Sequence, residues 1–422
     1  MGSGQGLEQS QGGKRLYGAA TFTWMMFSMN VCIPLFFLGT IGYSLGLNPV
    51  EVAVGAFLGN LATAVVMILN GLPGVKYGIP YPVQLRPSWG IRGSHIPIVL
   101  RGVVGAGWFG IEAYSGSLAA LMIALVLANY GGGEASAIAS SSFRYVVFVI
   151  AVYVVLAAAV VAKGLKAIAR LVNVSGPLLL LYFIWLTIYL GSHKSTSAAI
   201  PSGAGFFSRE FALYLAIQTN FWATVALNIS DLSRGLHAGK CGARALVVGP
   251  MVGIVATSVV ASILGYYMTL YTGYITPQEI ILYAAPGLVA VLVGQLFAFL
   301  APFSTDVTAN IPALMNLLVY SLRAGKYALP VAAIIGFLLA PWWAVERGPD
   351  VVEYVAAFTA NYGVLLGPIA GIMIADYYLV KKMSYDVGKL HKEGPGKYWC
   401  RSGFNYSAIL TYAASVAGIY LF

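Results

Sequence analysis

The sequence predicts an all-α polytopic membrane protein with about eleven transmembrane helices. Of its 422 residues, 59% are hydrophobic and only 9% are charged, whereas a soluble domain carries about 25% charged residues. Apolar runs of roughly eighteen residues or more, such as 145–162 and 245–268, recur along the chain, and each is long enough to cross a bilayer as a helix. A soluble globular fold is therefore excluded.

Polar and charged breaks divide the chain into the expected spans. These are 20–41, 50–72, 99–128, 143–162, 171–191, 209–229, 243–270, 281–319, 327–345, 352–379 and 405–422. If the amino terminus is cytoplasmic, alternation places twenty of the 24 Lys and Arg residues inside. The four outside are Arg144, Lys194, Arg209 and Arg347. This bias supports the span count and a cell-membrane protein with a cytoplasmic amino terminus, because positive charge concentrates in cytoplasmic loops.

Two acidic residues fall at bilayer depth. Glu112 lies about halfway along the third span, and Asp306 lies inside the eighth. An ionisable group there costs several kcal/mol unless it is paired or hydrated, so both are candidates for ligand binding or ion coupling. A protonated or hydrogen-bonded structural carboxyl is the alternative for each. Asp231 and Asp376 lie at helix ends, which favours an interfacial position.

Spans 1 and 6 are interrupted in corresponding ways. Span 1 contains Asn30 and Pro34, and span 6 contains the polar run 218–220 just before Phe221 and Trp222. Such interruptions indicate a transporter site where half-helices expose free backbone groups. A simple kink is the alternative, because proline and asparagine are tolerated in membrane helices.

The interrupted spans and the acid-bearing spans are each five spans apart, which predicts inverted repeats, since an odd number of spans reverses orientation. We expect a cytoplasmic tail at 1–18, a first repeat at 19–191 and a second repeat at 209–379. A cytoplasmic loop at 380–404 and an eleventh span at 405–422 follow.

Aromatic and hydroxyl side chains accompany the acids at mid-membrane. Trp108 and Trp222 lie near the middle of their spans, away from the interfacial aromatic belt, and either form a slot for a planar heterocycle or fill space. Ser304 and Thr305 either complete an oxygen cage for a small cation or bond back to their own helix.

Other classes of function are disfavoured. The four histidines lie in predicted loops, so an enzyme has no nucleophile and base at membrane depth. The three cysteines are scattered singly and form no metal or disulfide pattern. The net charge of +10 is better explained by loops facing anionic membrane lipids than by nucleic acid. A channel would need a selectivity ring, and no repeat of that kind appears.

Four motifs resemble the nucleobase:cation symporter-1 family, which includes the bacterial hydantoin transporter, over nearly the whole chain. They are RPSWGIRGSHIP at 86–97, GWFGIE at 107–112, FWATVALNISD at 221–231 and GPIAGIMIADYY at 367–378. The resemblance implies a LeuT-type fold with a five-plus-five inverted repeat. It also implies inward transport of a planar heterocycle together with sodium or protons.

The same resemblance implies a set of site residues. Trp108 and Trp222 match the tryptophans on the two faces of the substrate, and Asn310 matches a substrate-binding asparagine. The full set of expected substrate residues is Trp108, Glu112, Trp222, Asn310, Asn30 and Phe221. The expected sodium ligands are the carbonyls of Met26, Met29 and Ala301 and the hydroxyls of Ser304 and Thr305.

The chain departs from the family pattern at several positions. Glu112 and Asn30 both stand where the hydantoin transporter has glutamine. An ionised Glu112 only accepts hydrogen bonds, which favours a ligand edge with two N–H donors or a coupling to protons. Asp306 stands in an asparagine position and is the second candidate coupling acid. The chain also ends after eleven expected spans, where the family usually has twelve.

We therefore expect a secondary active symporter, not an enzyme, that imports a nucleobase or related planar heterocycle with sodium, or with protons, by alternating access. A carrier of the same fold for an amino acid or vitamin is the alternative, because a fold does not choose its substrate. The sequence leaves the particular heterocycle and the oligomeric state open.

Overall fold

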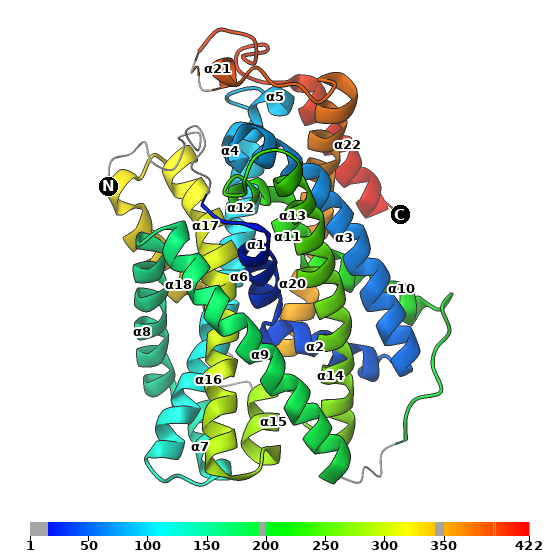
Figure 1. Cartoon of the computed structure of the whole chain (residues 1–422), viewed down its shortest axis with the longest axis vertical. Coiled ribbons are helices and arrows are strands. Elements are labelled where there is room, and N and C mark those ends of the chain that lie inside the picture. The colour runs from blue at the N-terminus through cyan, green and yellow to red at the C-terminus, as the bar shows by residue number, and fades with distance from the viewer. Residues whose placement is uncertain (1–15, 194–198, 342–349, 391, 393, 422) are drawn as a thin grey trace.

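The computed structural model describes residues 16–193, 199–341, 350–390, 392 and 394–421 (Figure 1). Within these ranges the elements are helices, and the only strand-like pairings are two isolated bridges, Tyr17 with Leu236 and Arg401 with Phe404. The prediction of an all-α protein is confirmed.

Helices occupy all eleven predicted spans. In chain order they are α1 (Ala19–Asn30) with α2 (Ile33–Ser44), α3 (Pro49–Tyr77), α6 (His95–Leu127), α8 (Phe143–Ala162), α9 (Leu165–His193), α10 (Arg209–Phe221) with α11 (Ala223–Asn228), α13 (Lys240–Pro250) with η1 (Met251–Ala256) and α14 (Thr257–Thr272), α16 (Gly287–Thr305) with η2 (Asp306–Asn310), α17 (Ile311–Met315) and η3 (Asn316–Ser321), α18 (Ala328–Leu339), α20 (Asp350–Ala375) with η5 (Asp376–Val380), and α22 (Tyr406–Leu421). Short helices in the connections are α4 (Tyr81–Gln84), α5 (Arg86–Trp89), α7 (Gly132–Ser141), α12 (Ser230–Ser233), α15 (Pro277–Ala284), η4 (Gly325–Tyr327) and α21 (Val387–Leu390). Among the described residues, six helices are long and apolar enough to cross a membrane, or seven if the bent pair α1–α2 is one span.

The structure differs from the sequence prediction at the start of span 8. Residues 281–284 belong to the separate helix α15, and α16 begins only at Gly287. Pro286 lacks a backbone N–H, and Gly287 has φ +74°, a left-handed conformation that glycine adopts without strain. Together these two residues separate the short helix from the long one.

The span helices form two groups. In one group, α2 packs on α14 and α10 packs on α3 (Figure 1). In the other, α6 packs against α8, α16 and α18. The contact of span 1 with span 7 and that of span 6 with span 2 are equivalent under a five-plus-five repeat. The boundaries of the two repeats stay a prediction.

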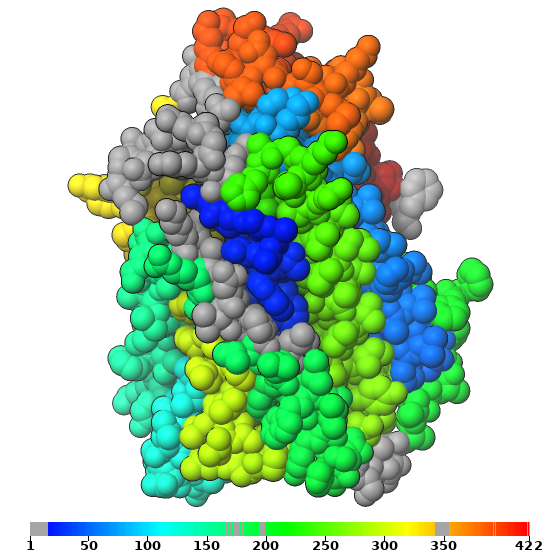
Figure 2. Space-filling model, in the orientation of Figure 1, coloured from blue at the N-terminus to red at the C-terminus, as the bar shows by residue number. Residues whose placement is uncertain are grey.

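Close approach through glycine places α1 against η1, and Figure 2 shows the start of the described chain beside the green surface of this region. A Cβ atom at Gly253 would lie 2.4 Å from the Cβ of Met26 and 2.7 Å from the backbone nitrogen of Phe27. Only glycine fits such a contact, because real Cβ atoms do not approach so closely. The end of α1 is therefore held directly against span 7.

The loop after η5 covers α5 at one end of the molecule (Figures 1 and 2). The backbone N–H of Arg92 donates to the carbonyl of Gly403 at 2.8 Å, and that of Asn405 donates to the carbonyl of Trp89 at 2.8 Å. Gly90, with φ +82°, allows this approach, since a Cβ there would lie 2.6 Å from the Gly403 oxygen. The loop is thus fastened to the 86–97 motif by main-chain hydrogen bonds.

Candidate functional site

Both expected helix interruptions are present. The axes of α1 and α2 differ by 55° across Val31 and Cys32, and Pro34 occupies the first turn of α2, where its missing N–H leaves no bond unmade. In span 6 the break lies at Trp222, between α10 and α11. The polar run 218–220, which the sequence suggested as the interruption, is helical and belongs to α10.

The two breaks are joined by the side chain of Asn30. Its amide nitrogen donates to the carbonyls of Gly253 at 3.1 Å and Ile254 at 2.9 Å, and its amide oxygen accepts the indole N–H of Trp222. The network continues through Ser258, whose hydroxyl donates to Asn60 at 3.1 Å. Asn30 was expected beside the substrate. In the structure its amide group binds span 7 and the indole of Trp222, and so fixes the orientation of Trp222.

An aromatic cluster lies at the break in span 6. Phe221 has its ring 5.4 Å from Trp108 and 5.3 Å from Trp222, nearly perpendicular to both. The three side chains are buried. Phe221 thus links the two tryptophans that the sequence placed on opposite faces of a slot.

Span 10 contributes two further rings that the sequence analysis did not single out. Phe358 and Tyr362 lie 5.6 Å and 6.3 Å from Trp108, and the hydroxyl of Tyr362 donates to the carbonyl of Phe221 at 3.0 Å. The two residues are four apart on α20, a spacing that puts them on one helix face. The spacing of Phe358 and Tyr362 in the sequence could have indicated an aromatic helix face. It does not tell which other helix that face contacts.

Glu112 lies one turn after Trp108 on α6 and is 1% exposed. The thiol of Cys32, from the break in span 1, lies close to it. The Glu112 Oε2 atom has no hydrogen-bond partner among the described residues. The break in span 1 thus brings Cys32, which the sequence indicated only as an isolated cysteine, close to the acid of span 3.

Asp306 is also fully buried, but both of its carboxylate oxygens are used. The hydroxyl of Tyr153 donates to Oδ2 at 2.9 Å, and the amide of Asn310 donates to Oδ1 at 2.9 Å. Asp306 and Asn310 are the first and last residues of the π-helical turn η2, and such turns often occur at functional sites. Asn310 therefore binds Asp306 through its nitrogen and keeps its amide oxygen for other partners.

The expected cation ligands converge where α16 meets the end of α1. The Thr305 hydroxyl donates to the carbonyls of Met29 at 2.8 Å and Ala301 at 3.2 Å. The Ser304 hydroxyl donates to the carbonyls of Ala301 and Ser28, both at 2.9 Å. Ser28 was not in the expected set. Met26, whose carbonyl was expected as a ligand, packs against Gly249 and Gly253.

This oxygen set fits a small monovalent cation. Its members are neutral hydroxyls and carbonyls, and rotating the two hydroxyls would turn their lone pairs inward. Among the described residues no three His, Cys, Asp or Glu side chains converge as they do in sites for multivalent metals.

Arg101 is a buried cation near the start of the third predicted span, and the charge alternation placed it on the cytoplasmic side. It is 1% exposed within α6, and its Nε–H donates to the Thr224 carbonyl at 2.9 Å and to Asn228 Oδ1 at 3.0 Å. Its two terminal nitrogens have no partner among the described residues. Arg101 lies two turns from Trp108, on the same face of α6.

Comparisons with known proteins agree with this arrangement. The family described as permease for cytosine/purines, uracil, thiamine, allantoin matches residues 11–422. A purine-uracil permease of Arabidopsis thaliana is 30% identical, over 94% of this chain and 68% of its own. The hydantoin permease of Microbacterium maritypicum is 24% identical, over 97% of this chain and 82% of its own.

Two solved structures show the same fold. Mhp1, described as a nucleobase-cation-symport-1 family transporter in a closed conformation with bromovinylhydantoin bound, superposes with a TM-score of 0.81 at 22% identity, over 97% of this chain and 88% of its own. MhsT in complex with L-phenylalanine superposes with a TM-score of 0.66 at 14% identity, over 97% and 99%. The fold is therefore the LeuT type, as expected.

Proposed function

We propose that this chain, which belongs to the family of permeases for cytosine/purines, uracil, thiamine and allantoin, is a symporter that imports a planar nitrogen heterocycle together with a sodium ion. Membership of this family makes the chain a transporter of nucleobases or related solutes, and not an enzyme. Beyond that, we propose the direction of transport, the coupling ion and the residues that bind each solute. It also places the protein in the cell membrane with its amino terminus in the cytoplasm.

The free oxygen of Glu112 carries the proposal for the substrate. A buried carboxylate oxygen without a partner is unfavourable, and a ligand that donates N–H groups removes that penalty. Trp108, one turn away, offers an aromatic face on which a flat ring stacks. A purine or pyrimidine with adjacent N–H donors has both properties.

Phe221 completes the proposed slot. Its ring lies between Trp108 and Trp222 here, beside a helix break where a change of rotamer disturbs little regular structure. We infer that Phe221 leaves this position when the heterocycle stacks between the two tryptophans. Asn30 keeps Trp222 oriented, and Asn310 offers its amide oxygen to the edge of the ligand.

The coupling proposal depends on the contact between α1 and α16. A sodium ion bound by the Met29 and Ala301 carbonyls and the Ser304 and Thr305 hydroxyls would join the end of the broken helix to span 8. Sodium would then raise the affinity for the heterocycle, and the heterocycle would raise that for sodium by the same factor. Proton coupling through Glu112 or Asp306 is the competing mechanism.

The test is thermal stability of the purified protein with purines, pyrimidines, hydantoins, vitamins and amino acids, each in sodium or potassium buffer. A ligand that binds the folded state raises the unfolding temperature. We expect stabilisation by one group of N–H-bearing heterocycles, and only in sodium. Stabilisation by an amino acid would favour the kind of carrier that MhsT exemplifies. Equal heterocycle stabilisation in both salts would reject sodium coupling.

A further inference from the structure

Arg101 joins the two groups of span helices inside the membrane. It lies on α6, in the group that α6 forms with α8, α16 and α18. Its Nε–H donates to the carbonyl of Thr224 at 2.9 Å and to the side-chain oxygen of Asn228 at 3.0 Å. Both acceptors belong to α11, which continues span 6 and packs on α3 in the other group. Arg101 therefore bridges the groups on the side of Trp108 that we place toward the cytoplasm.

The positive charge of Arg101 is not paired with an acid. Within the described ranges no hydrogen bond or ion pair joins it to a carboxylate. Asp231 lies three residues after Asn228, but its Oδ1 accepts the backbone N–H of Tyr81 at 2.9 Å. Its Oδ2 accepts from the amides of Asn228 at 3.1 Å and Asn316 at 2.6 Å.

The terminal nitrogens of Arg101 are unused donors. The residue is 1% exposed, and neither Nη1 nor Nη2 has a hydrogen-bond partner among the described residues. Unmet polar groups are costly away from water, and a buried cation within a membrane span often marks the path of a solute. The guanidinium is therefore a candidate for contact with the transported molecule.

The guanidinium of Arg101 lies on the side of the proposed slot. A Cβ atom at Gly105, one turn further along α6 toward Trp108, would lie 2.9 Å from Nη1 of Arg101. The same atom would lie 3.0 Å from the Cβ of Ala313 and 3.2 Å from the carbonyl oxygen of Asn310. Glycine at this position lets the guanidinium lie close to the helix, where α6 meets the end of η2. The charged end of Arg101 is thus directed along α6 toward the slot.

We propose that Arg101 is a second, transient binding site, which takes the carbonyl oxygens of the heterocycle as it passes from the slot to the cytoplasm. This inference rests on the proposed function. Inward opening by alternating access parts the two groups of spans, which breaks the bonds between Arg101 and α11 and frees every N–H of the guanidinium. A guanidinium offers paired donors in one plane, which match the oxygens at the edge of a flat ring.

The two charged residues of α6 then bind different parts of one ring. Glu112 accepts from N–H groups in the slot, and Arg101 donates to carbonyl oxygens along the exit. A ring that leaves the slot loses its contacts with Glu112 and Trp108, and the contact with Arg101 replaces part of them and speeds release. The preferred substrates are therefore rings with both N–H groups and carbonyl oxygens, such as hypoxanthine or uracil, over rings with amino groups only, such as adenine.

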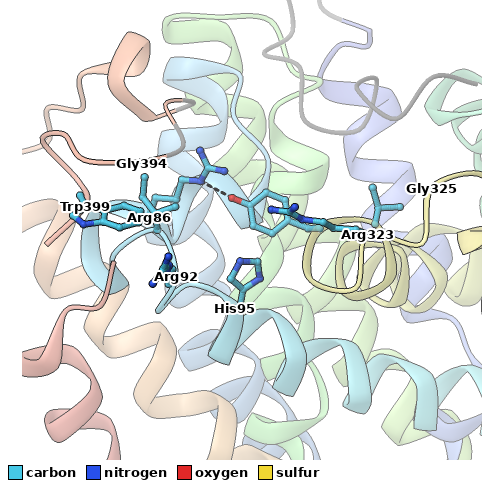
Figure 3. A pocket seen from close by; sticks show the side chains of 10 residues that line it. Arg86, Arg92, His95, Arg323, Gly325, Gly394 and Trp399 are labelled. Atoms are coloured by element: carbon cyan, nitrogen blue, oxygen red, sulfur yellow. Dashed lines mark hydrogen bonds between the residues drawn. The ribbon is translucent and has the colours of Figure 1, made fainter. Parts of the chain in front are cut away.

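The test compares hypoxanthine with adenine, which share the same fused rings but carry a carbonyl or an amino group at one position. Uracil and diaminopyrimidine form the corresponding pyrimidine pair. Initial uptake into proteoliposomes, driven by a sodium or a proton gradient, is measured for wild type and Arg101→Gln, together with equilibrium binding. The matched control is Arg92→Gln. This exposed arginine precedes α6 and lines a separate cavity of about 560 Å³ at the end of the molecule (Figure 3).

We expect wild type and Arg92→Gln to take up the carbonyl-bearing ring at least about tenfold faster than the amino-bearing ring. Arg101→Gln should slow the carbonyl-bearing ring at least about tenfold and the other less than about threefold, because only the first loses charge-assisted contacts. Equilibrium binding of the carbonyl-bearing ring should stay within about threefold of wild type, because the slot itself is intact.

Three results would overturn the proposal. Equal slowing of both rings would show that Arg101 only joins the spans, and a comparable loss in equilibrium binding would place it in the slot. Uptake without preference for the carbonyl-bearing ring in wild type would remove the exit site. If Arg101→Gln does not fold, Arg101→Lys decides by the same comparison, because it keeps the charge but not the paired donors. Failure of the proposed function is distinct, since no heterocycle would then stabilise wild type.

Discussion

The two buried acids of this transporter occupy corresponding spans but different environments. Asp306 receives hydrogen bonds on both carboxylate oxygens, from Tyr153 and Asn310. Glu112 has one oxygen without a partner and lies beside the break in span 1 and one turn from Trp108. The difference separates an acid that organises span 8 from one that is available to a ligand.

Two further candidate residues, Asn310 and Asn30, are held in place by buried hydrogen bonds. Asn310, which we propose binds the ligand, is anchored by Asp306, so the acid of span 8 orients it. Asn30 is anchored in the same manner by span 7 and in turn orients Trp222. Two of the proposed ligand-binding side chains, Asn310 and Trp222, are thus each held by a buried polar side chain, which is how a preorganised site is built.

The largest expected effect comes from Glu112→Gln. The change keeps the size of the side chain but replaces a charged acceptor with an amide, so a ligand edge with two N–H donors loses a charge-assisted bond. We expect affinity for such a heterocycle to fall about 10- to 100-fold. Equilibrium binding of the radiolabelled ligand measures it, and an affinity within twofold of wild type would remove Glu112 from the substrate site.

The next effect concerns Ser304→Ala combined with Thr305→Ala. Losing two hydroxyl ligands should abolish the sodium dependence of binding while leaving weak, sodium-independent affinity, because substrate contacts on spans 3 and 6 are untouched. Binding measured against sodium concentration tests this. A variant that keeps the full sodium response would place the cation elsewhere. Thr308→Ala, whose hydroxyl donates to the Ser304 carbonyl at 2.6 Å, is the matched control.

Asp306→Asn should have a smaller effect on binding than Glu112→Gln. An asparagine oxygen still accepts from Tyr153 or Asn310, so one hydrogen bond of the pair is lost at most, worth about 1 kcal/mol of unfolding free energy. We expect a lower unfolding temperature with heterocycle affinity within about tenfold of wild type. If Asp306→Asn instead abolishes the pH dependence of uptake, Asp306 is the coupling acid and its role is not only structural.

The smallest expected effect is that of Trp222→Phe. Phenylalanine keeps a stacking face but cannot donate to Asn30, so ring orientation is loosened without loss of the slot. We expect affinity to fall about three- to tenfold, in keeping with the loss of one neutral hydrogen bond. Trp222→Ala serves as the comparison, since it removes both the bond and the face. Equal affinities in the two variants would show that no ligand stacks on residue 222.

Much of the fold could be predicted from the sequence because membrane spans need long apolar runs and their loops carry a bias in positive charge. The breaks in spans 1 and 6 were visible as Pro34 and the polar run 218–220, although the second break lies at Trp222 itself. The separation of α15 from α16 was missed because residues 281–319 read as one hydrophobic segment. Hydropathy does not resolve the two-residue interruption at Ala285 and Pro286.

The residues of the candidate site could be predicted from the sequence better than their hydrogen-bonding partners. The sequence indicated both acids and both hydroxyls, but only the packing shows that Asn30 binds Trp222 and that Tyr153 binds Asp306. The charge alternation placed Arg101 on the cytoplasmic side but gave it no partner, and the structure buries it against α11. Contacts between distant spans depend on helix rotation, which a linear pattern does not determine.

The most direct test of the central claim is a titration of one nucleobase, chosen from the stability panel, against wild type, Glu112→Gln and Asp306→Asn, each in sodium and in potassium. We expect tight binding only in sodium for wild type and Asp306→Asn, and an affinity about 10- to 100-fold lower for Glu112→Gln in sodium. Binding that survives Glu112→Gln unchanged but is lost in Asp306→Asn would contradict it, because the acid with paired oxygens would then be the one that meets the ligand.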